Sequence, residues 1–252
     1  MSHAFGATEV LRGLDLDIAA GSFVALVGPS GCGKSTLLRL VSRLDTPTAG
    51  RVDIEPEATP GASGPPAAER LAFVFQDAHL LPWRTVLENV ALPLELQHQP
   101  RAAARERAQA ALRDVELADA IARFPDELSG GMRMRVSIAR ALVTDPALLL
   151  LDEPFAALDE LTRQRLDERL RALFLRRGMT VLFVTHSLAE AVYLADRALV
   201  FSPRPARVVL DHPIALPRER PGALRTALPF VEQTAILYQA LEKHGSLGEA
   251  NA

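Results

Sequence analysis

A glycine-rich stretch at residues 28–36, Gly-Pro-Ser-Gly-Cys-Gly-Lys-Ser-Thr, carries the strongest chemical signal in the sequence. It follows the apolar run 23–27 and precedes another at 37–41, so we expect it where a buried strand turns into a helix. In such a loop the backbone N–H groups and the helix N-terminus bind phosphate, Lys34 reaches the β and γ phosphates, and Ser35 binds Mg²⁺. A plain glycine-rich turn before an amphipathic helix would explain the glycines but not the Lys-Ser pair.

Polar residues also follow three other apolar runs of strand length, at 71–75, 148–151 and 180–184; they are Gln76, Asp152 with Glu153, and Thr185 with His186. The carboxyl ends of strands in an open α/β sheet line the ligand crevice, so we expect these side chains to converge on the edge that carries Lys34. Two adjacent carboxylates at the end of a buried strand are costly unless a metal or a reaction uses them. We therefore assign Asp152 to Mg²⁺, Glu153 to polarising the attacking water, and Gln76 to the nucleotide or its metal.

Ser129, Gly130 and Gly131 open a helix that is expected to continue to residue 143. Exposed N–H groups at a helix N-terminus form a potential second anion site. Taken alone, the same three residues could be an N-cap with a flexible turn.

The order of elements predicts an α/β core with a helical lobe inserted between its two parts. Strands are expected at 10–18, 23–27, 52–54, 71–75, 148–151 and 180–184, with short edge strands at 198–201 and 208–210. Helices are expected at 101–117, 129–143, 160–176 and 229–241, and an exposed loop at 55–66. We place a core domain at 1–217, with the helical lobe at about 78–142, and a C-terminal helical extension and tail at 218–252.

Composition narrows the class of protein. The 252 residues are 48% hydrophobic, enough for a globular core, and the formal net charge of −3 argues against a dominant nucleic-acid surface. The one cysteine, Cys32, excludes an internal disulfide framework and is interpreted as a small filler in the loop rather than a nucleophile. We find no apolar run long enough to cross a bilayer, so any action at a membrane is expected to go through a partner.

The stretch 80–84, Leu-Leu-Pro-Trp-Arg, leaves two interpretations open. It is either an ordinary loop with a buried Trp anchor or a contact surface for another protein.

Six motifs, in this order, resemble the ATP-binding cassette family over nearly the whole chain. They are the Walker A loop at 28–35, the Q-loop at Gln76, the signature at 128–132, the Walker B strand at 148–153, the D-loop at 157–159 and the switch histidine His186. The resemblance implies a RecA-like P-loop NTPase core with an antiparallel β subdomain and an inserted helical lobe. It also implies an ATP-hydrolysing enzyme whose two copies pair head to tail, each ATP lying between one Walker A loop and the signature of the partner. Departures are Ser187, where an acidic residue often follows the histidine, and Met134, where Gln is common.

The resemblance gives a full set of site residues. The catalytic residues are Glu153, His186 and Gln76, and the Mg²⁺ ligands are Ser35, Gln76 and Asp152. ATP would be bound by an adenine-stacking aromatic residue, by the Walker A loop and by the signature, which are Phe5, Gly28, Pro29, Ser30, Gly31, Cys32, Gly33, Lys34, Ser35, Thr36, Ser129, Gly130 and Gly131.

A finer resemblance, to the ATPase subunits of nitrate, sulfonate and taurine importers, lies in residues 76–83, 151–159 and 185–197. It implies a homodimer at the cytoplasmic face of the plasma membrane, bound to integral membrane permease subunits and served by a periplasmic solute-binding protein, without nucleic acid. In that setting residues 80–83 border the groove for a permease helix. The alternatives are a soluble cassette ATPase acting on nucleic acid or ribosomes, which usually has two cassettes or a long coiled-coil insertion, and a P-loop kinase or GTP-binding switch, against which the signature and His186 argue.

Overall fold

The structure is a computed structural model that describes residues 1–54, 70–156 and 158–245. The expected loop at 55–66, Ala157 of the D-loop motif and the end of the C-terminal tail lie outside these residues. Two compact units make up the chain, one of Met1–Glu55 with Leu170–Ala252 and the other of Pro56–Arg169. The domain boundaries expected at 78, 142 and 217 stay a prediction.

Four strands of the first unit lie in the order β6-β3-β7-β8. These are β3 (Phe23–Val27), β6 (Thr180–Val184), β7 (Arg197–Phe201) and β8 (Val208–Pro213). β3 pairs in parallel with both β6 and β7, and all five of its side chains are buried. A strand covered on both faces needs a continuous apolar run, and Phe-Val-Ala-Leu-Val supplies it.

Three of the strand predictions need correction. The strand expected at 10–18 is β2 (Thr8–Leu11), which pairs antiparallel with β1 (His3–Phe5), and residues 12–18 form no strand. The residues around Val52 and Ile54 also form no strand. β7 is not an edge strand, because it lies between β3 and an antiparallel β8. Its run Ala-Leu-Val-Phe is buried throughout, which favours an interior place.

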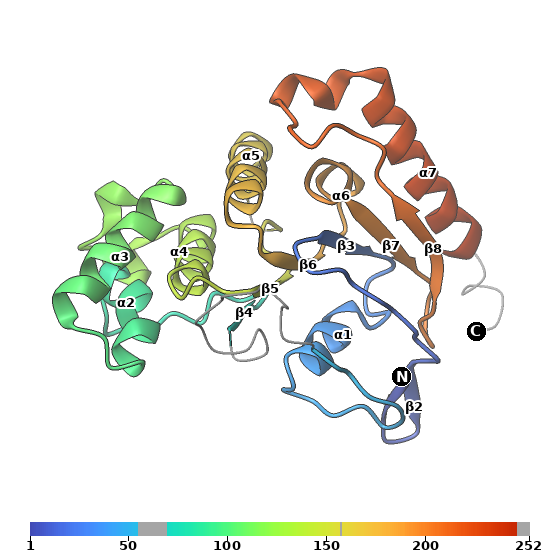
Figure 1. The fold of residues 1–252 in the computed structure, drawn as a ribbon, viewed down its shortest axis with the longest axis horizontal. Helices are drawn as coiled ribbons and strands as arrows, with labels where there is room; N and C mark the ends of the chain where they lie inside the picture. Colours follow the sequence, from blue (N-terminus) through green and yellow to red (C-terminus); the bar gives the residue numbers. More distant parts are fainter. Residues whose placement is uncertain (55–69, 157, 246–252) are drawn as a thin grey trace, which may run out of the picture. The chain divides into compact units, whose positions relative to one another are not determined.

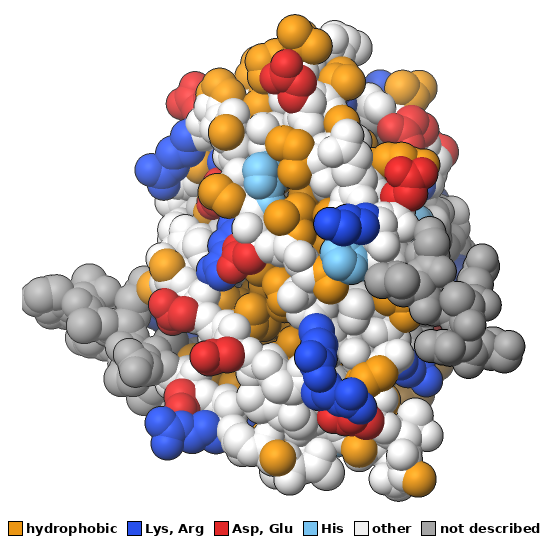
Figure 2. Space-filling view, turned by 90° about the vertical axis from the view of Figure 1, so that its right-hand side faces the viewer, with side chains coloured by type: hydrophobic (Ala, Val, Ile, Leu, Met, Phe, Trp, Pro, Cys, Tyr) orange, Lys and Arg blue, Asp and Glu red, His pale blue; other side chains and the backbone are white. Residues whose placement is uncertain are grey.

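Helices cover both faces of this sheet (Figure 1). α1 (Lys34–Val41) lies on one face, and α6 (Leu188–Leu194) with α7 (Leu228–Gly245) lies on the other. α7 starts one residue before the predicted helix and ends four residues after it, and it contacts α6, β7 and β8. No helix of the described residues is long and apolar enough to span a bilayer. On the face shown in Figure 2, basic, acidic and apolar side chains are interspersed.

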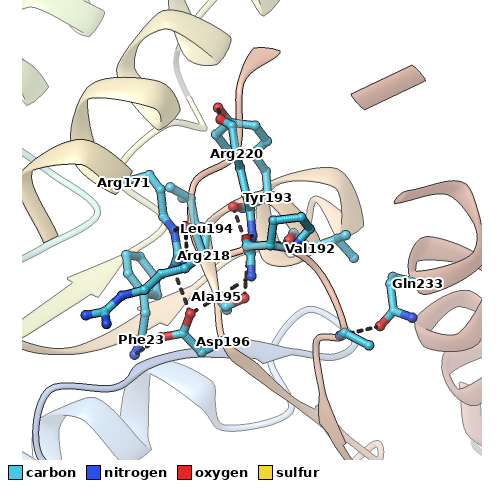
Figure 3. A network of polar contacts seen from close by, with 12 residues as sticks. Phe23, Arg171, Val192, Tyr193, Leu194, Ala195, Asp196, Arg218, Arg220 and Gln233 are labelled. Carbon is cyan, nitrogen blue, oxygen red and sulfur yellow. Dashed lines mark hydrogen bonds and ion pairs between the residues drawn. The ribbon is translucent and has the colours of Figure 1, made fainter. Parts of the chain in front are cut away.

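A buried polar network fastens the segment after β8 to α6 (Figure 3). The Arg220 guanidinium donates to the carbonyls of Val192, Tyr193 and Ala195, each at 2.8 Å. Arg171 donates to the Leu194 carbonyl and to Asp196 Oδ1, both at 2.8 Å. The two arginines therefore satisfy the carbonyls that the C-terminus of a short helix leaves unpaired.

The second unit combines a strand pair with the helical segment. β4 (Leu71–Val74) pairs in parallel with β5 (Leu148–Asp152), close to the predicted positions. α2 (Val86–Leu96), α3 (Arg101–Asp114) and α4 (Gly130–Leu142) pack on one another, and α4 contacts β4. Short 3-10 turns at Ala118–Ala120 (η2) and Pro125–Glu127 (η3) connect α3 to α4. A further 3-10 turn at Gly222–Thr226 (η4) belongs to the first unit, where it precedes α7. α5 (Glu160–Arg177) continues across the boundary between the units.

α3 ends three residues before its predicted end at 117. Its cap residue is Val115, and Glu116 adopts a left-handed φ of 57°. The apolar side chains of Val115 and Leu117 are buried although they no longer belong to the helix. Periodicity alone therefore overestimated the length of this helix.

Candidate functional site

The loop after β3 has the geometry of a phosphate-binding loop. Lys34 is the first residue of α1 and is buried, and its ammonium group donates to the carbonyls of Gly28 at 2.8 Å and Pro29 at 2.9 Å. The lysine is thereby folded back over the loop at the N-terminus of the helix. Backbone N–H groups, the helix dipole and an ammonium group are thus collected at one point, as an anionic phosphate requires.

Gly33 shows why this loop needs glycine. Its φ is 126°, and a Cβ at this position would lie 2.8 Å from Val10 Cγ1 and from Leu11 Cδ2. Any side chain would therefore collide with strand β2 as well as strain the backbone. The loop is pressed against the core of its own unit.

Cys32 is a buried filler, as its sequence context predicts. Its side chain is buried, and burial raises the pKa of the thiol, although the nearby Lys34 opposes the shift. A thiol in this protonated state is a poor nucleophile.

His186 follows the strand next to the phosphate-binding loop. Leu26 of β3 lies opposite Val184 of β6 in a parallel pair, so the two strands end side by side at one edge. Thr185 is buried, and its hydroxyl accepts from the Ser187 N–H at 2.9 Å and donates to Glu190. The exposed His186 is therefore held between two anchored residues at the edge that carries Lys34.

Gln76 and the two carboxylates share an edge in the other unit. Val74 lies opposite Leu151 in the parallel pair of β4 and β5, so Gln76, Asp152 and Glu153 follow strands that end together. Glu153 has a φ of 47°, an unusual conformation for a non-glycine residue that is often retained at functional sites. No residue pattern around Glu153 predicts this strained backbone.

These donors fit Mg²⁺ by their chemistry. Asp152 supplies a buried carboxylate, and Ser35 and Gln76 supply neutral oxygens, which are the hard ligands that this ion prefers. Among the residues that the structure describes, no group of three His, Cys, Asp or Glu side chains could hold a metal ion. Mg²⁺ commonly takes only one or two carboxylates and completes its shell with water and phosphate oxygens.

The predicted convergence therefore has two parts. Lys34, Ser35 and His186 come together in the first unit, and Gln76, Asp152 and Glu153 come together in the second. The meeting of the two sets stays a prediction.

Ser129 caps α4 as the sequence predicts. Its hydroxyl accepts from the Met132 N–H at 3.3 Å, and Ser129 and Gly130 are both exposed. The helix N-terminus is therefore open to solvent. Whether it binds a phosphate of a second copy stays a prediction.

Phe5 lies at the end of β1 and is 53% exposed. The buried His3 ring contacts it edge to face, with the ring centroids 4.7 Å apart. The exposed Phe5 ring, supported by this contact, is available for stacking on a base.

Arg140 is a residue that sequence reasoning missed. It lies in the last turn of α4 and donates to the carbonyls of Ala78 at 2.8 Å and His79 at 2.9 Å, just after Gln76. Burial lowers the pKa of its guanidinium. The signal in the sequence was weak, because Arg140 shares its helix face with Ser137 and Arg133.

The loop before α2 presents Trp83 to solvent, with 71% of the residue exposed. The buried Asn89 shapes this loop by accepting from the Leu81 N–H and donating to the carbonyls of Leu81, Arg84 and Thr85. The interpretation of Trp83 as a buried anchor is therefore wrong, because Asn89 anchors the loop instead.

Comparisons with known proteins identify the family of the chain. Residues 11–156 match the ABC transporter family. The aliphatic sulfonates import ATP-binding protein SsuB of Pseudomonas putida is 44% identical over 249 residues, which cover 99% of this chain and 87% of the relative. SsuB 1 of Rhizobium johnstonii is 45% identical over 220 residues, covering 87% of this chain and 77% of the relative.

A solved structure shows the same fold. A dimeric ATP-binding cassette in a post-hydrolysis state, bound to ADP and Pi, superimposes with a TM-score of 0.72 at 32% identity, covering 85% of this chain and 96% of that one. This confirms the expected P-loop NTPase fold class. The chain belongs to the ABC transporter family of ATP-binding cassettes.

Proposed function

We propose that the chain is the ATP-hydrolysing subunit of an importer for aliphatic sulfonates or a related small anion. The observation that carries ATP binding is the position of Lys34, whose ammonium lies over the loop carbonyls at the N-terminus of α1. The observation that favours sulfonates is the name of its relatives, the aliphatic sulfonates import ATP-binding proteins. Nitrate and taurine remain alternative solutes.

In the proposed mechanism, two copies pair head to tail. Phe5 stacks on adenine, the loop at 28–36 and Lys34 hold the phosphates, and Ser129 to Gly131 of a second copy approach the γ phosphate. Mg²⁺, held by Ser35, Gln76 and Asp152, would neutralise phosphate charge. Closure of the dimer brings these groups together, and hydrolysis reopens it.

Hydrolysis needs a base and a group that senses the γ phosphate. Glu153 orients and polarises the attacking water, and its φ of 47° is a strained conformation of the kind retained at functional sites. His186, held between Thr185 and Ser187, contacts the transferred phosphate. Both residues directly follow buried strands, β5 and β6, which fix the position of their backbone.

The partners are integral membrane permease subunits, which bind the subunit at the cytoplasmic face of the membrane. The exposed Trp83, on a loop shaped by Asn89, is the proposed contact with a permease helix. A periplasmic solute-binding protein delivers the solute to the permease.

Glu153→Gln tests the assignment of the catalytic base. We expect ATP binding to survive, steady-state hydrolysis to fall by about 10²-fold or more, and a closed dimer to accumulate in size-exclusion chromatography with ATP. Glu232→Gln, at an exposed position of α7, is the matched control and should hydrolyse ATP like the wild type. Hydrolysis at the wild-type rate by Glu153→Gln would reject Glu153 as the base.

Solute identity is tested by uptake. The subunit is co-expressed with the permease and binding-protein genes that adjoin its own, and import of a labelled aliphatic sulfonate, taurine and nitrate is compared. Stimulation by the sulfonate alone supports the proposal. Import of nitrate alone would overturn the sulfonate assignment without affecting the ATPase assignment.

A further inference from the structure

The hairpin between β7 and β8 lies against the outside of the phosphate-binding loop, within the first unit. A Cβ at Gly28 would lie 3.0 Å from Phe201 Cβ and from the Phe201 carbonyl oxygen. The end of β7 therefore packs directly against the start of the loop.

Hydrogen bonds between Ser202 and Arg207 close the loop that joins β7 to β8. The Ser202 N–H donates to the Arg207 carbonyl at 3.0 Å, and the Arg207 N–H donates to the Ser202 hydroxyl at 3.1 Å. Ala206 hydrogen-bonds to β2 and to the residue after it, donating to the Val10 carbonyl at 2.8 Å and accepting from the Arg12 N–H at 3.0 Å. A short loop closed in this way holds Arg204 in one place.

Arg204 reaches the middle of the phosphate-binding loop. Its Nε donates to the Gly31 carbonyl, and a Cβ at Gly31 would lie 3.4 Å from Arg204 Nη2. The charge also acts on Cys32, because Arg204 lowers the pKa of this thiol in opposition to burial. The guanidinium thus covers the loop from its outer side.

A series of hydrogen bonds links Arg204 through the loop to Lys34. In a trans peptide the C=O and N–H point in opposite directions, so a Gly31 carbonyl held outward turns the Cys32 N–H inward. That N–H donates to the Pro29 carbonyl at 3.3 Å, and the same carbonyl accepts from Lys34 Nζ at 2.9 Å. A cation on one end of such a chain polarises the peptide and strengthens the donor at the other.

We propose that Arg204 is a positioning residue for the phosphate-binding loop. It fixes the Gly31–Cys32 peptide, so that the Cys32 N–H holds the Pro29 carbonyl that also accepts from Lys34, and the loop keeps its curled shape before a nucleotide arrives. Arg204 itself does not contact the nucleotide. The proposal rests on the proposed function, because it assumes that the loop binds ATP.

The test compares Arg204→Met with Arg207→Met, which removes the same charge from the same hairpin while leaving the loop contact in place. Nucleotide affinity is measured by fluorescence titration with a methylanthraniloyl derivative of ATP, and ATPase rates are measured over a range of ATP concentrations. For Arg204→Met we expect the Kd and KM to rise about fivefold to tenfold with kcat nearly unchanged. Arg207→Met should match the wild type, and Arg204→Lys should recover part of the affinity.

A second measurement reports on the loop without ATP hydrolysis. Cys32 is the one cysteine of the chain, so the rate at which iodoacetamide alkylates it measures how often the loop opens. Arg204→Met should be alkylated several times faster than Arg207→Met in the absence of nucleotide, because the loop opens more often. Removal of the Arg204 charge by itself would slow alkylation, since it no longer lowers the pKa of the thiol.

The outcomes separate the two proposals. If the wild type binds no methylanthraniloyl ATP, the proposed function fails. If the wild type binds it and Arg204→Met shows unchanged affinity and unchanged alkylation, the positioning role of Arg204 is overturned. A fall in kcat at constant KM would also contradict this role, since it would indicate action on the chemical step.

Discussion

Arg220 and Tyr193 bind each other's backbone. The Arg220 guanidinium donates to the Tyr193 carbonyl at 2.8 Å, and the Tyr193 hydroxyl donates to the Arg220 carbonyl. Both side chains are buried, and Arg225 stacks over the Tyr193 ring at 3.7 Å from its centroid. This reciprocal pair joins the segment before α7 to the end of α6, the helix that begins just after His186 (Figure 3).

Arg220→Met should destabilise the protein by on the order of 3 kcal/mol, because it leaves three buried carbonyls without their donor. Burial lowers the pKa of Arg220 to about 10, so the group is charged at neutral pH and its hydrogen bonds are charge-assisted. Denaturation in urea measures the loss. Arg218→Met, which removes the same charge at an exposed neighbouring position, should change the free energy of unfolding little; an equal loss in both variants would contradict the capping role.

Gly33→Ala should abolish nucleotide binding and destabilise the fold. The new Cβ would meet Val10 and Leu11 at 2.8 Å in a conformation with φ 126°, for a cost on the order of 3 kcal/mol. Gly13→Ala is the control, because Gly13 has a φ of +58° but nothing within 4 Å, so about 1 kcal/mol is expected. Thermal unfolding and nucleotide titration distinguish the two, and equal effects would show that steric contact is unimportant at Gly33.

Arg140→Met should lower kcat about tenfold and leave the ATP Kd nearly constant. The reason is that the carbonyls of Ala78 and His79 lose their donor, which loosens the segment just after Gln76 while the phosphate-binding loop is untouched. Arg107→Met is the matched control, since the Arg107 guanidinium donates at 2.9 Å to the carbonyl of Val143, the residue that caps the same helix. A proportional loss of activity in both variants would indicate general destabilisation instead.

The pair of Arg197 and Asp211 should contribute to the acid sensitivity of the fold. Arg197 Nε donates to Asp211 Oδ1 at 2.6 Å, and this hydrogen bond lowers the pKa of Asp211 below its usual 3.8. The unfolded chain therefore binds the proton at higher pH than the folded one, so the stabilisation is present above about pH 4 and is lost as the pH falls through the lowered folded value.

The effect of this pair is small because both side chains are partly exposed, about 0.5 kcal/mol for such a surface pair. Asp211→Asn should therefore lose less stability than the wild type between about pH 5 and pH 3 in urea denaturation. Asp119→Asn, at an exposed position of η2, is the control and should follow the wild type. An identical pH profile for Asp211→Asn and the wild type would refute the assigned role.

Local sequence was sufficient to predict the elements on which the site depends. β3, β6, α1 and α4 lie where apolar runs and glycine-rich loops predicted them, because a buried parallel strand and a phosphate-binding turn each require a characteristic local pattern. The ABC transporter family was predicted for the same reason, and the comparisons confirm it. Where local pattern was weak, as at residues 12–18 and 52–54, the predicted strands were wrong.

The features that depend on contacts between distant segments were decided only by the tertiary structure. The interior position of β7 depends on which strand pairs with β3, and the exposure of Trp83 depends on Asn89 anchoring its loop. Arg204 lies far from Gly31 in the sequence, so only the packing of the β7–β8 hairpin brings the two together. The sequence by itself determined the glycine-rich loop that we propose to bind phosphate, because its residues are contiguous, whereas side chains that hold this loop in place come from distant segments and are assembled only by folding.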